Sequence, residues 1–142
     1  MKAVVRVDCE QVPDAAHATW SNALIVGDEI VMSGMTAHPA TVNASEPLST
    51  YDQTIVVLEK IRALVETAGG DTGCITKLVV YVTNIADKTE VGRARKTFFA
   101  GHIEAGGAYP CSTLVEVSGL VFPELRVEIE ACARLDIARR TA

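Results

Sequence analysis

Apolar and acidic residues alternate along a strand-like segment near the C-terminus. Successive strand side chains point to opposite faces of a sheet, so Val127, Ile129 and Ala131 are predicted to share one face. Glu128 and Glu130 then point to the other face. Carboxylates between buried apolar residues are unusual in a simple core strand, because a buried charge must be paired or hydrated. The carboxylates of the second face are therefore expected to be hydrated, paired with other groups or functional.

Five further segments have the composition and spacing of strands. The sequence Gly27-Asp28 separates two of them at the spacing of a β-hairpin. A long polar stretch, residues 35–48, follows this hairpin and is predicted to be a loop, and loops of that length often carry function. The predicted strands are residues 3–7, 21–26, 29–34, 75–82 and 112–118, followed by the last strand over residues 125–135.

Two segments have helical periodicity instead. A capping-box pattern at residues 50–53 precedes apolar residues at helical spacing, and Gly69-Gly70 is predicted to end that helix. A second capping-box pattern at residues 87–90 precedes another apolar stripe, which Gly106-Gly107 is predicted to close. The two stripes consist of Ile55, Leu58, Ile61, Leu64 and Val65, and of Val91, Ala94, Phe98, Phe99 and Ile103.

The predicted order is β-β-β-α-β-α-β-β, which is typical of an α+β fold. Right-handed crossovers would place both helices on one face of a mixed sheet. The other face, carrying Glu116, Glu128 and Glu130, would have no helix to cover it. A large half-apolar sheet face is unfavourable in a monomer. The pattern therefore predicts self-association through this face, with sites between subunits.

Composition and charge narrow the functional classes. The chain has 142 residues, which predicts a single domain over residues 1–142. Its net charge of −5 disfavours nucleic-acid and anionic-membrane partners, which require a basic surface. The four cysteines form no C-x-x-C pair, and no apolar run is long enough to span a membrane. We therefore expect a cytoplasmic protein with free thiols, no metal site and no cofactor.

Between Trp20 and Ala133 the chain resembles the Rid proteins, the reactive intermediate or imine deaminases also called YjgF-type or L-PSP. Each matching piece is short, but their order and spacing are specific. The pieces are residues 26–34 (VGDEIVMSG), 53–54 (QT), 58–61 (LEKI), 68–69 (AG), 75–82 (ITKLVVYV), 98–99 (FF), 109–110 (YP), 115–117 (VEV) and 127–131 (VEIEA). The resemblance implies a chorismate-mutase-like α+β domain and a homotrimer whose sheets form a central barrel, with three small-molecule sites between subunits.

The resemblance also implies roles for particular residues. Glu128 matches the glutamate that positions the attacking water, and is the candidate catalytic residue. An arginine that clamps the substrate carboxylate in the deaminating members is replaced here by Ser112, within the segment Pro110-Cys111-Ser112-Thr113. Ordinary 2-imino acids are therefore expected to be poor substrates. The substrate-binding candidates are Trp20, Ser33, Gly34, Ser112, Thr113 and Leu114.

Several alternatives remain open at this point. Glu128 is either an acid–base group or a carboxylate paired with Arg126 or Lys77. His17 and His38 lie in loops that flank the hairpin, where they either contribute acid–base chemistry or are merely solvated. The leading hypothesis is a hydrolytic deaminase of a small imine, enamine or related C–N compound. The alternative is a non-catalytic, small-molecule-binding or regulatory trimer. Ribonuclease activity, attached to some relatives, is disfavoured by the net negative charge.

Overall fold

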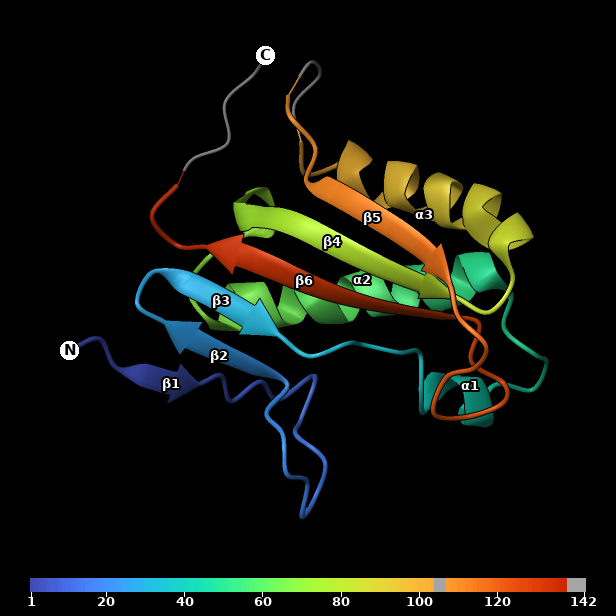
Figure 1. The fold of residues 1–142 in the computed structure, drawn as a ribbon, viewed down its shortest axis with the longest axis horizontal. Coiled ribbons are helices and arrows are strands. Elements are labelled where there is room, and N and C mark those ends of the chain that lie inside the picture. Colours follow the sequence, from blue (N-terminus) through green and yellow to red (C-terminus); the bar gives the residue numbers. More distant parts are fainter. Residues whose placement is uncertain (104–106, 138–142) are drawn as a thin grey trace.

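A mixed sheet of six strands forms one layer of the computed structural model, which describes residues 1–103 and 107–137 (Figure 1). The strand order is β1-β2-β3-β6-β4-β5. Strands β4 and β5 run parallel, whereas the other neighbouring pairs are antiparallel. The strands are β1 (Val4–Arg6), β2 (Ala23–Val26), β3 (Glu29–Met32), β4 (Ile75–Val82), β5 (Cys111–Glu116) and β6 (Val127–Arg134).

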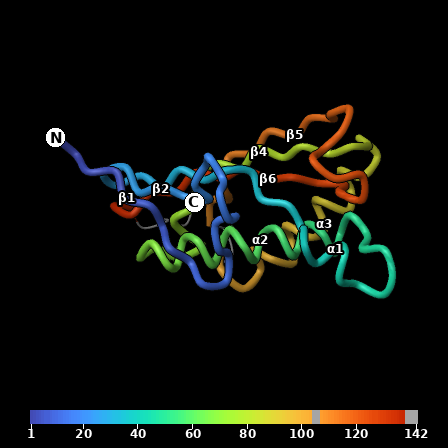
Figure 2. The backbone as a smooth tube through the Cα atoms, turned by 90° about the horizontal axis from the view of Figure 1, so that it is seen from below, coloured from blue at the N-terminus to red at the C-terminus, as the bar shows by residue number. Residues whose placement is uncertain are grey.

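Two long helices, α2 (Thr50–Thr67) and α3 (Lys88–Ala100), cover one face of this sheet. The edge-on view separates the two layers and leaves the opposite face of the sheet without a helix (Figure 2). Both the predicted α+β order and the placement of the helices on one face are confirmed. The structure adds a short helix, α1 (Ala40–Asn43), inside the predicted loop, and two single 3₁₀ turns, η1 (Thr72–Cys74) and η2 (Ile85–Asp87).

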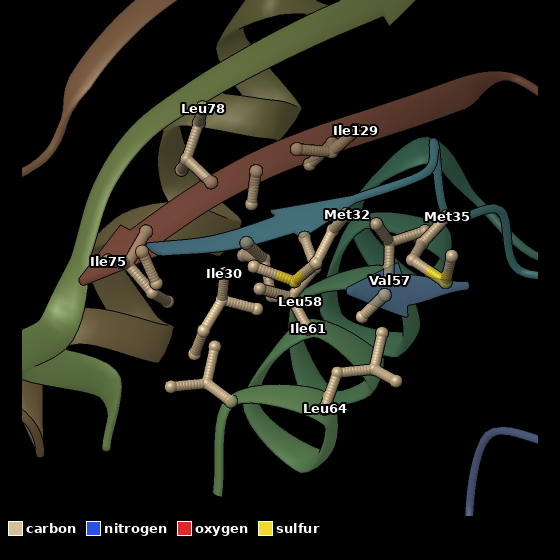
Figure 3. Close-up of a cluster of buried hydrophobic side chains, with 14 of the residues drawn as sticks. Ile30, Met32, Met35, Val57, Leu58, Ile61, Leu64, Ile75, Leu78 and Ile129 are labelled. Carbon is tan, nitrogen blue, oxygen red and sulfur yellow. The ribbon is translucent and has the colours of Figure 1, made fainter. Parts of the chain in front are cut away.

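The hydrophobic core lies between the helices and the sheet (Figure 3). Leu58, Ile61 and Leu64 of α2 are fully buried and face Ile30 of β3 and Ile129 of β6. Burying one such side chain contributes about 1.5–3 kcal/mol to folding. The apolar side chains of α2 and those of the strands therefore pack together in one layer. This packing determines which face of β6 points away from the helices. No helix among residues 1–103 and 107–137 has the length and apolarity that a membrane span requires.

The helix ends differ in detail from the predictions. Ser49, not Thr50, caps α2, and its hydroxyl accepts a hydrogen bond from the Asp52 amide at 3.1 Å. Thr50 is already helical and donates its hydroxyl to Asp87 at 2.8 Å. Asp87 therefore makes no side-chain cap for α3 and instead ties the two helices together. Helix α3 ends at Ala100, before Gly106, which lies outside the described residues.

The turn before β6 is held by a buried glutamine of α2. Gln53 donates to the Leu48 and Glu124 carbonyls, at 3.1 Å each, and accepts from the Arg126 amide at 2.9 Å. One side chain thus satisfies three backbone groups from two separate segments. The hydrogen bond to Arg126 lies immediately before Val127, the first residue of β6, so Gln53 fixes where that strand begins.

Candidate functional site

The predicted alternation along β6 is confirmed. Val127, Ile129 and Ala131 are buried against the helices, whereas Glu128 and Glu130 are half-buried on the face without helices. We call this second surface the open face. In the sheet register, residues directly opposite each other on neighbouring strands share a face. The open face therefore also carries Tyr81 of β4, which pairs with Glu128, and Val115 of β5, which pairs with Tyr81.

One acidic residue was assigned to the wrong face. Glu116 pairs with Val82, whose side chain is buried on the helix side, so Glu116 does not belong to the open face. Its carboxylate accepts a hydrogen bond from the Ile85 amide at 2.9 Å, at the start of η2. The prediction was wrong because Glu116 pairs with Val82 whereas Glu128 pairs with Tyr81, the preceding residue of β4, and the sequence pattern alone does not give these registers.

The Glu128 carboxylate lies against the backbone of Gly34. A Cβ atom on residue 34 would stand 2.9 Å from Glu128 Cδ and 3.0 Å from Cγ, closer than unbonded carbon atoms approach. This contact arises where the pairing between β3 and β6 shifts by one residue, between the Val31–Cys132 pair and the Met35–Ile129 bridge. Met35 and Ile129 exchange two backbone hydrogen bonds, at 2.8 and 3.1 Å, which hold the segment down. Such bulges commonly re-aim the chain beside active sites.

The environment of Glu128 favours its protonated form. Burial raises the pKa of this carboxyl above its ordinary value, and the neighbouring charge of Glu130 raises it further. Among the described residues, no cation lies within salt-bridge distance of Glu128. Lys77, considered as its partner, donates instead to Thr113 at 3.0 Å. Glu128 is thus a carboxyl whose pKa is shifted toward neutrality, which suits acid–base chemistry.

Glu130 has a different role from its neighbour. The Tyr81 hydroxyl donates a hydrogen bond to the Glu130 carboxylate, across the β4–β6 pair. This hydrogen bond is the main cause that raises the pKa of Tyr81, and burial adds to it. Burial raises the pKa of the Cys132 thiol, and the charge of Glu130 raises it further. The hydrogen bond to Glu130 therefore favours the protonated form of Tyr81, and burial, with the charge of Glu130, favours that of Cys132, so neither is prepared as a nucleophile.

The three candidates on β5 separate between the faces. Ser112 pairs with Leu78 and lies on the helix side, where its hydroxyl accepts a hydrogen bond from Arg95 of α3 at 2.6 Å. Leu114 also lies on the helix side and packs against the core. Thr113 lies on the open face beside Lys77. Within one chain, Ser112 and Glu128 thus point to opposite sides of the sheet, and the structure does not bring them together.

The N-terminal candidates lie next to Gly34. The Ser33 hydroxyl donates to the Ser21 carbonyl at 2.7 Å, which places the Trp20–Ser21 segment beside the Ser33–Gly34 segment. The Trp20 side chain is 59% exposed and lines a hollow with His17. His38 lies elsewhere, with its ring centroid 4.4 Å from that of Phe122. The Trp20–Ser21 segment therefore lies beside Ser33, the residue before Gly34, whereas His38 belongs to the loop that contains α1.

Two residues near these positions were not singled out from the sequence. Tyr81 lies on the same face as Lys77 in the strand alternation, so its face was predictable, but its pairing with Glu130 depends on register. Arg95 lies on α3, and no sequence signal connects it with Ser112 on β5. The described part of the chain also contains four free cysteines and no group of three His, Cys, Asp or Glu side chains that could hold a metal ion.

Comparison with known proteins identifies the family. The model of the family described as Endoribonuclease L-PSP matches residues 9–135, nearly the whole chain. The chain belongs to the Rid (YjgF, L-PSP) family. A 2-iminobutanoate/2-iminopropanoate deaminase of Salmonella typhimurium is 31% identical over 84% of this chain and 89% of its own length. The putative reactive intermediate deaminase TdcF of Escherichia coli is 33% identical over 61% of this chain and 64% of its own length.

Solved structures of Rid proteins share the fold. A Pseudomonas aeruginosa protein of unknown function is 57% identical, covers 100% of this chain and 99% of its own, and superposes with a TM-score of 0.93. E. coli TdcF with bound serine is 27% identical over 92% of this chain and 98% of its own, with a TM-score of 0.79. The predicted α+β fold of mixed sheet and helices is thus the YjgF-type fold, and relatives of this Rid chain are named as imine deaminases.

Proposed function

We propose that this Rid protein is a cytoplasmic, cofactor-independent hydrolase that deaminates a small imine, enamine or related C–N compound. The observation that carries the proposal is the Glu128 carboxyl. It lies against the Gly34 backbone, is half-buried with no cation of the described residues within salt-bridge distance, and has a pKa raised by burial. The names of the relatives as 2-imino acid deaminases support the same reaction class.

In this reaction Glu128 accepts a proton from water as the water oxygen attacks the imine carbon. The new C–O bond forms while the C=N π electrons move to nitrogen, which takes up a proton from the solvent. Glu128 then returns its proton to the nitrogen of the carbinolamine, the C–N bond breaks to release ammonia, and the hydroxyl gives a proton back to the solvent as the carbonyl forms. The products are a carbonyl compound and ammonia, and one carboxyl carries the proton in both directions. Gly34 has no side chain, and this leaves room for the Glu128 carboxyl against its backbone.

The site is proposed to lie between subunits of a homotrimer whose sheets form a central barrel. Glu128 and Ser112 are on opposite sides of the sheet in one chain, so a site that contains both needs two subunits. The open face supports association, because it exposes apolar residues such as Val31 and Val115, at 45% and 41%. Trp20, Ser33, Gly34, Thr113 and Leu114 are the further proposed substrate-binding residues.

Ordinary 2-imino acids are proposed to be poor substrates. An arginine fork binds a carboxylate through two parallel hydrogen bonds, and the hydroxyl of Ser112 has no charge to replace it. Removing the charged partner of a bound carboxylate costs on the order of 2–5 kcal/mol. Imines without an α-carboxylate lose nothing by this replacement, so they should be favoured relative to 2-imino acids.

The test is ammonia release from imines generated in situ, by an amino-acid oxidase for 2-imino acids and by an amine oxidase for imines without a carboxylate. We expect Glu128→Gln to lower the rate by about 10²–10⁴-fold. Glu29→Gln, which removes a carboxylate paired with Arg134 on the same face, is the matched control and should retain the rate. An unchanged rate in Glu128→Gln would overturn the mechanism. Saturable metabolite binding without turnover in any assay would favour the regulatory, non-catalytic alternative.

A further inference from the structure

Two carboxyls lie next to each other on the open face of β6. Glu128 and Glu130 are two residues apart on one strand, so their side chains share this face and their Cα atoms are about 7 Å apart. Both residues are half-buried, and burial weakens the screening of charge by water. Two neighbouring carboxyls are disfavoured when both are ionised. The pair therefore takes up a first proton more readily than two isolated carboxyls would, and that proton can reside on either residue.

The Tyr81 hydroxyl makes the two carboxyls unequal. It donates a hydrogen bond to the Glu130 carboxylate. Among residues 1–103 and 107–137, no hydrogen-bond donor and no cation lies within bonding distance of the Glu128 carboxylate. A hydrogen bond donated to a carboxylate stabilises its ionised form, whereas burial without a donor favours the protonated form. The contacts therefore favour the negative charge of the pair on Glu130 and the proton on Glu128.

The sheet register explains how one tyrosine affects both residues. On the antiparallel β4–β6 pair, Tyr81 lies directly opposite Glu128, and Val79 lies opposite Glu130. The Tyr81 side chain therefore extends diagonally, from its own position to that of Glu130. Diagonal neighbours of this kind are within reach of a long aromatic side chain. Phenylalanine would fill the same position without a hydroxyl, so the hydrogen bond can be removed with little change in packing.

The other charged groups near the pair have partners of their own or lie away from it. Lys77 of β4 donates to Thr113 at 3.0 Å, and Glu29 of β3 pairs with Arg134 at 3.0 Å. Arg126, just before β6, is exposed and forms no salt bridge with either carboxylate. The thiols of this face, both opposite Lys77 in the register, are Cys111 of β5 and Cys132 of β6.

We propose that Tyr81 and Glu130 are positioning residues for Glu128: by stabilising the negative charge on Glu130, the Tyr81 hydroxyl directs the proton of the acidic pair to Glu128. The charge kept on Glu130 also raises the pKa of Glu128, after the larger effect of burial. Environments that separate two neighbouring carboxyls in this way assign them different roles in acid–base chemistry. The consequence for deamination rests on the proposed function, in which Glu128 carries the proton. The position of the proton itself needs no substrate and is measured without an imine.

Carbon NMR of the glutamate side-chain carboxyls, followed over a series of pH values, locates the proton. Spectra of Glu128→Gln and Glu130→Gln identify the two signals. In the wild type we expect the Glu128 carbon to move while the Glu130 carbon keeps the chemical shift of a carboxylate. In Tyr81→Phe both carbons should move over the same pH range, because the two carboxyls then share the proton. In Glu130→Gln the Glu128 carbon should titrate in one step and at lower pH than in the wild type, because the neighbouring charge is gone.

Tyr51→Phe is the matched control for the loss of a hydroxyl. The Tyr51 hydroxyl donates to Thr97 at 3.1 Å, between α2 and α3, so both titration curves should be unchanged. Circular dichroism verifies that each variant is folded. In the ammonia-release assay, the pH below which the rate falls should be lower for Glu130→Gln than for the wild type, and unchanged for Glu29→Gln. A loss of packing alone would lower the rate without moving this pH.

The wild type alone can overturn the proposal, without any variant. It is wrong if the Glu128 and Glu130 carbons of the wild type move together with pH, or if the Tyr81→Phe curves match those of the wild type. Failure of the deaminase proposal has a different signature. In that case no imine is turned over, or Glu128→Gln keeps the full rate, while the carbon titrations still place the proton on Glu128.

Discussion

The side chain of Glu128 occupies the space where residue 34 would carry a Cβ atom. That atom would lie 2.9 Å from Glu128 Cδ and 3.0 Å from Cγ, so residue 34 must be glycine if Glu128 is to keep its position. The backbone cannot move away easily, because Met35 and Ile129 hold it with two hydrogen bonds. The glycine and the carboxylate therefore form one unit, although they come from distant parts of the chain.

Gly34→Ala tests this unit. The added methyl overfills the contact, so we expect the free energy of unfolding to fall by about 1–3 kcal/mol. Glu128→Ala clears the same space, and in that background the cost of Gly34→Ala should be at least about 0.5 kcal/mol smaller. Urea unfolding of the four proteins of this double-mutant cycle measures the coupling. Equal costs in the two backgrounds would show that the side chains do not meet.

Gly92→Ala provides the matched control for that cycle. Gly92 lies within α3, and a Cβ there would meet no atom within 4 Å. Replacing a helical glycine with alanine should raise the free energy of unfolding by about 0.5–1 kcal/mol, because alanine loses less conformational freedom. The free energy of unfolding is expected to fall for Gly34→Ala and to rise for Gly92→Ala. This difference in sign distinguishes a steric clash at residue 34 from a general effect of alanine.

Most of the fold was predictable because its patterns are local. Alternation along residues 127–131 gave the correct faces of β6, and helical spacing placed α2 and α3 on the covered side. The errors arose where a side chain forms a hydrogen bond with a neighbouring helix instead of capping its own helix. Thr50 and Asp87 both match capping residues in the sequence, yet they bond each other across two helices. A local pattern does not distinguish these uses of the same residue types.

The sequence predicted those features of the site that lie within one segment, but not the contacts between segments. Glu128 was found because it interrupts an apolar pattern, and Gly34 because of the family resemblance. Their contact depends on a one-residue shift in pairing between β3 and β6, which no local signal encodes. From the sequence, Ser112 was interpreted only as the loss of the arginine charge at this position. Its neighbour Arg95 comes from α3, and only the packing of that helix on the sheet brings the two together.

Gln53→Leu should destabilise the protein more than its modest change in size suggests. The Arg126 amide and the Leu48 and Glu124 carbonyls would all lose a partner at this nearly fully buried position. A buried polar group left without a partner costs about 1–3 kcal/mol, so a total loss of at least about 2 kcal/mol is expected. Urea unfolding measures it, with Ser49→Ala as a reference that loses one capping bond worth about 1 kcal/mol. A loss no larger than this reference would mean that water replaces the glutamine.

Glu128 should make stability depend on pH in a specific direction. Its pKa is raised in the folded protein, mainly by burial, from an ordinary value of 4.5. The folded state therefore binds the proton more tightly than the unfolded chain does. The resulting stability is fully present below the unfolded pKa and is lost as the pH rises through the folded pKa. Glu128→Gln, which cannot ionise, should thus gain stability relative to the wild type as the pH rises from below 4.5 to neutral.

Urea unfolding of both proteins over a series of pH values gives this difference directly. Glu29→Gln, on the same face, controls for the loss of one negative charge. If the difference between wild type and Glu128→Gln stays constant with pH, then Glu128 titrates as it does in the unfolded chain. The same shift predicts that deamination falls as the pH decreases through the raised pKa, since a protonated carboxyl cannot accept a proton from water.

The open face should hold subunits together. Val31 and Val115 lie on it, on different strands, and each exposes more than two-fifths of its surface. Light scattering after gel filtration should give the mass of three chains for the wild type. Replacing both valines with lysine should weaken association at least tenfold, because a charge buried in a contact without a partner is unfavourable. Val42→Lys, at an exposed position of α1 outside this face, should leave the mass unchanged. A wild-type protein that is monomeric at micromolar concentrations would remove the basis for a site shared by two subunits.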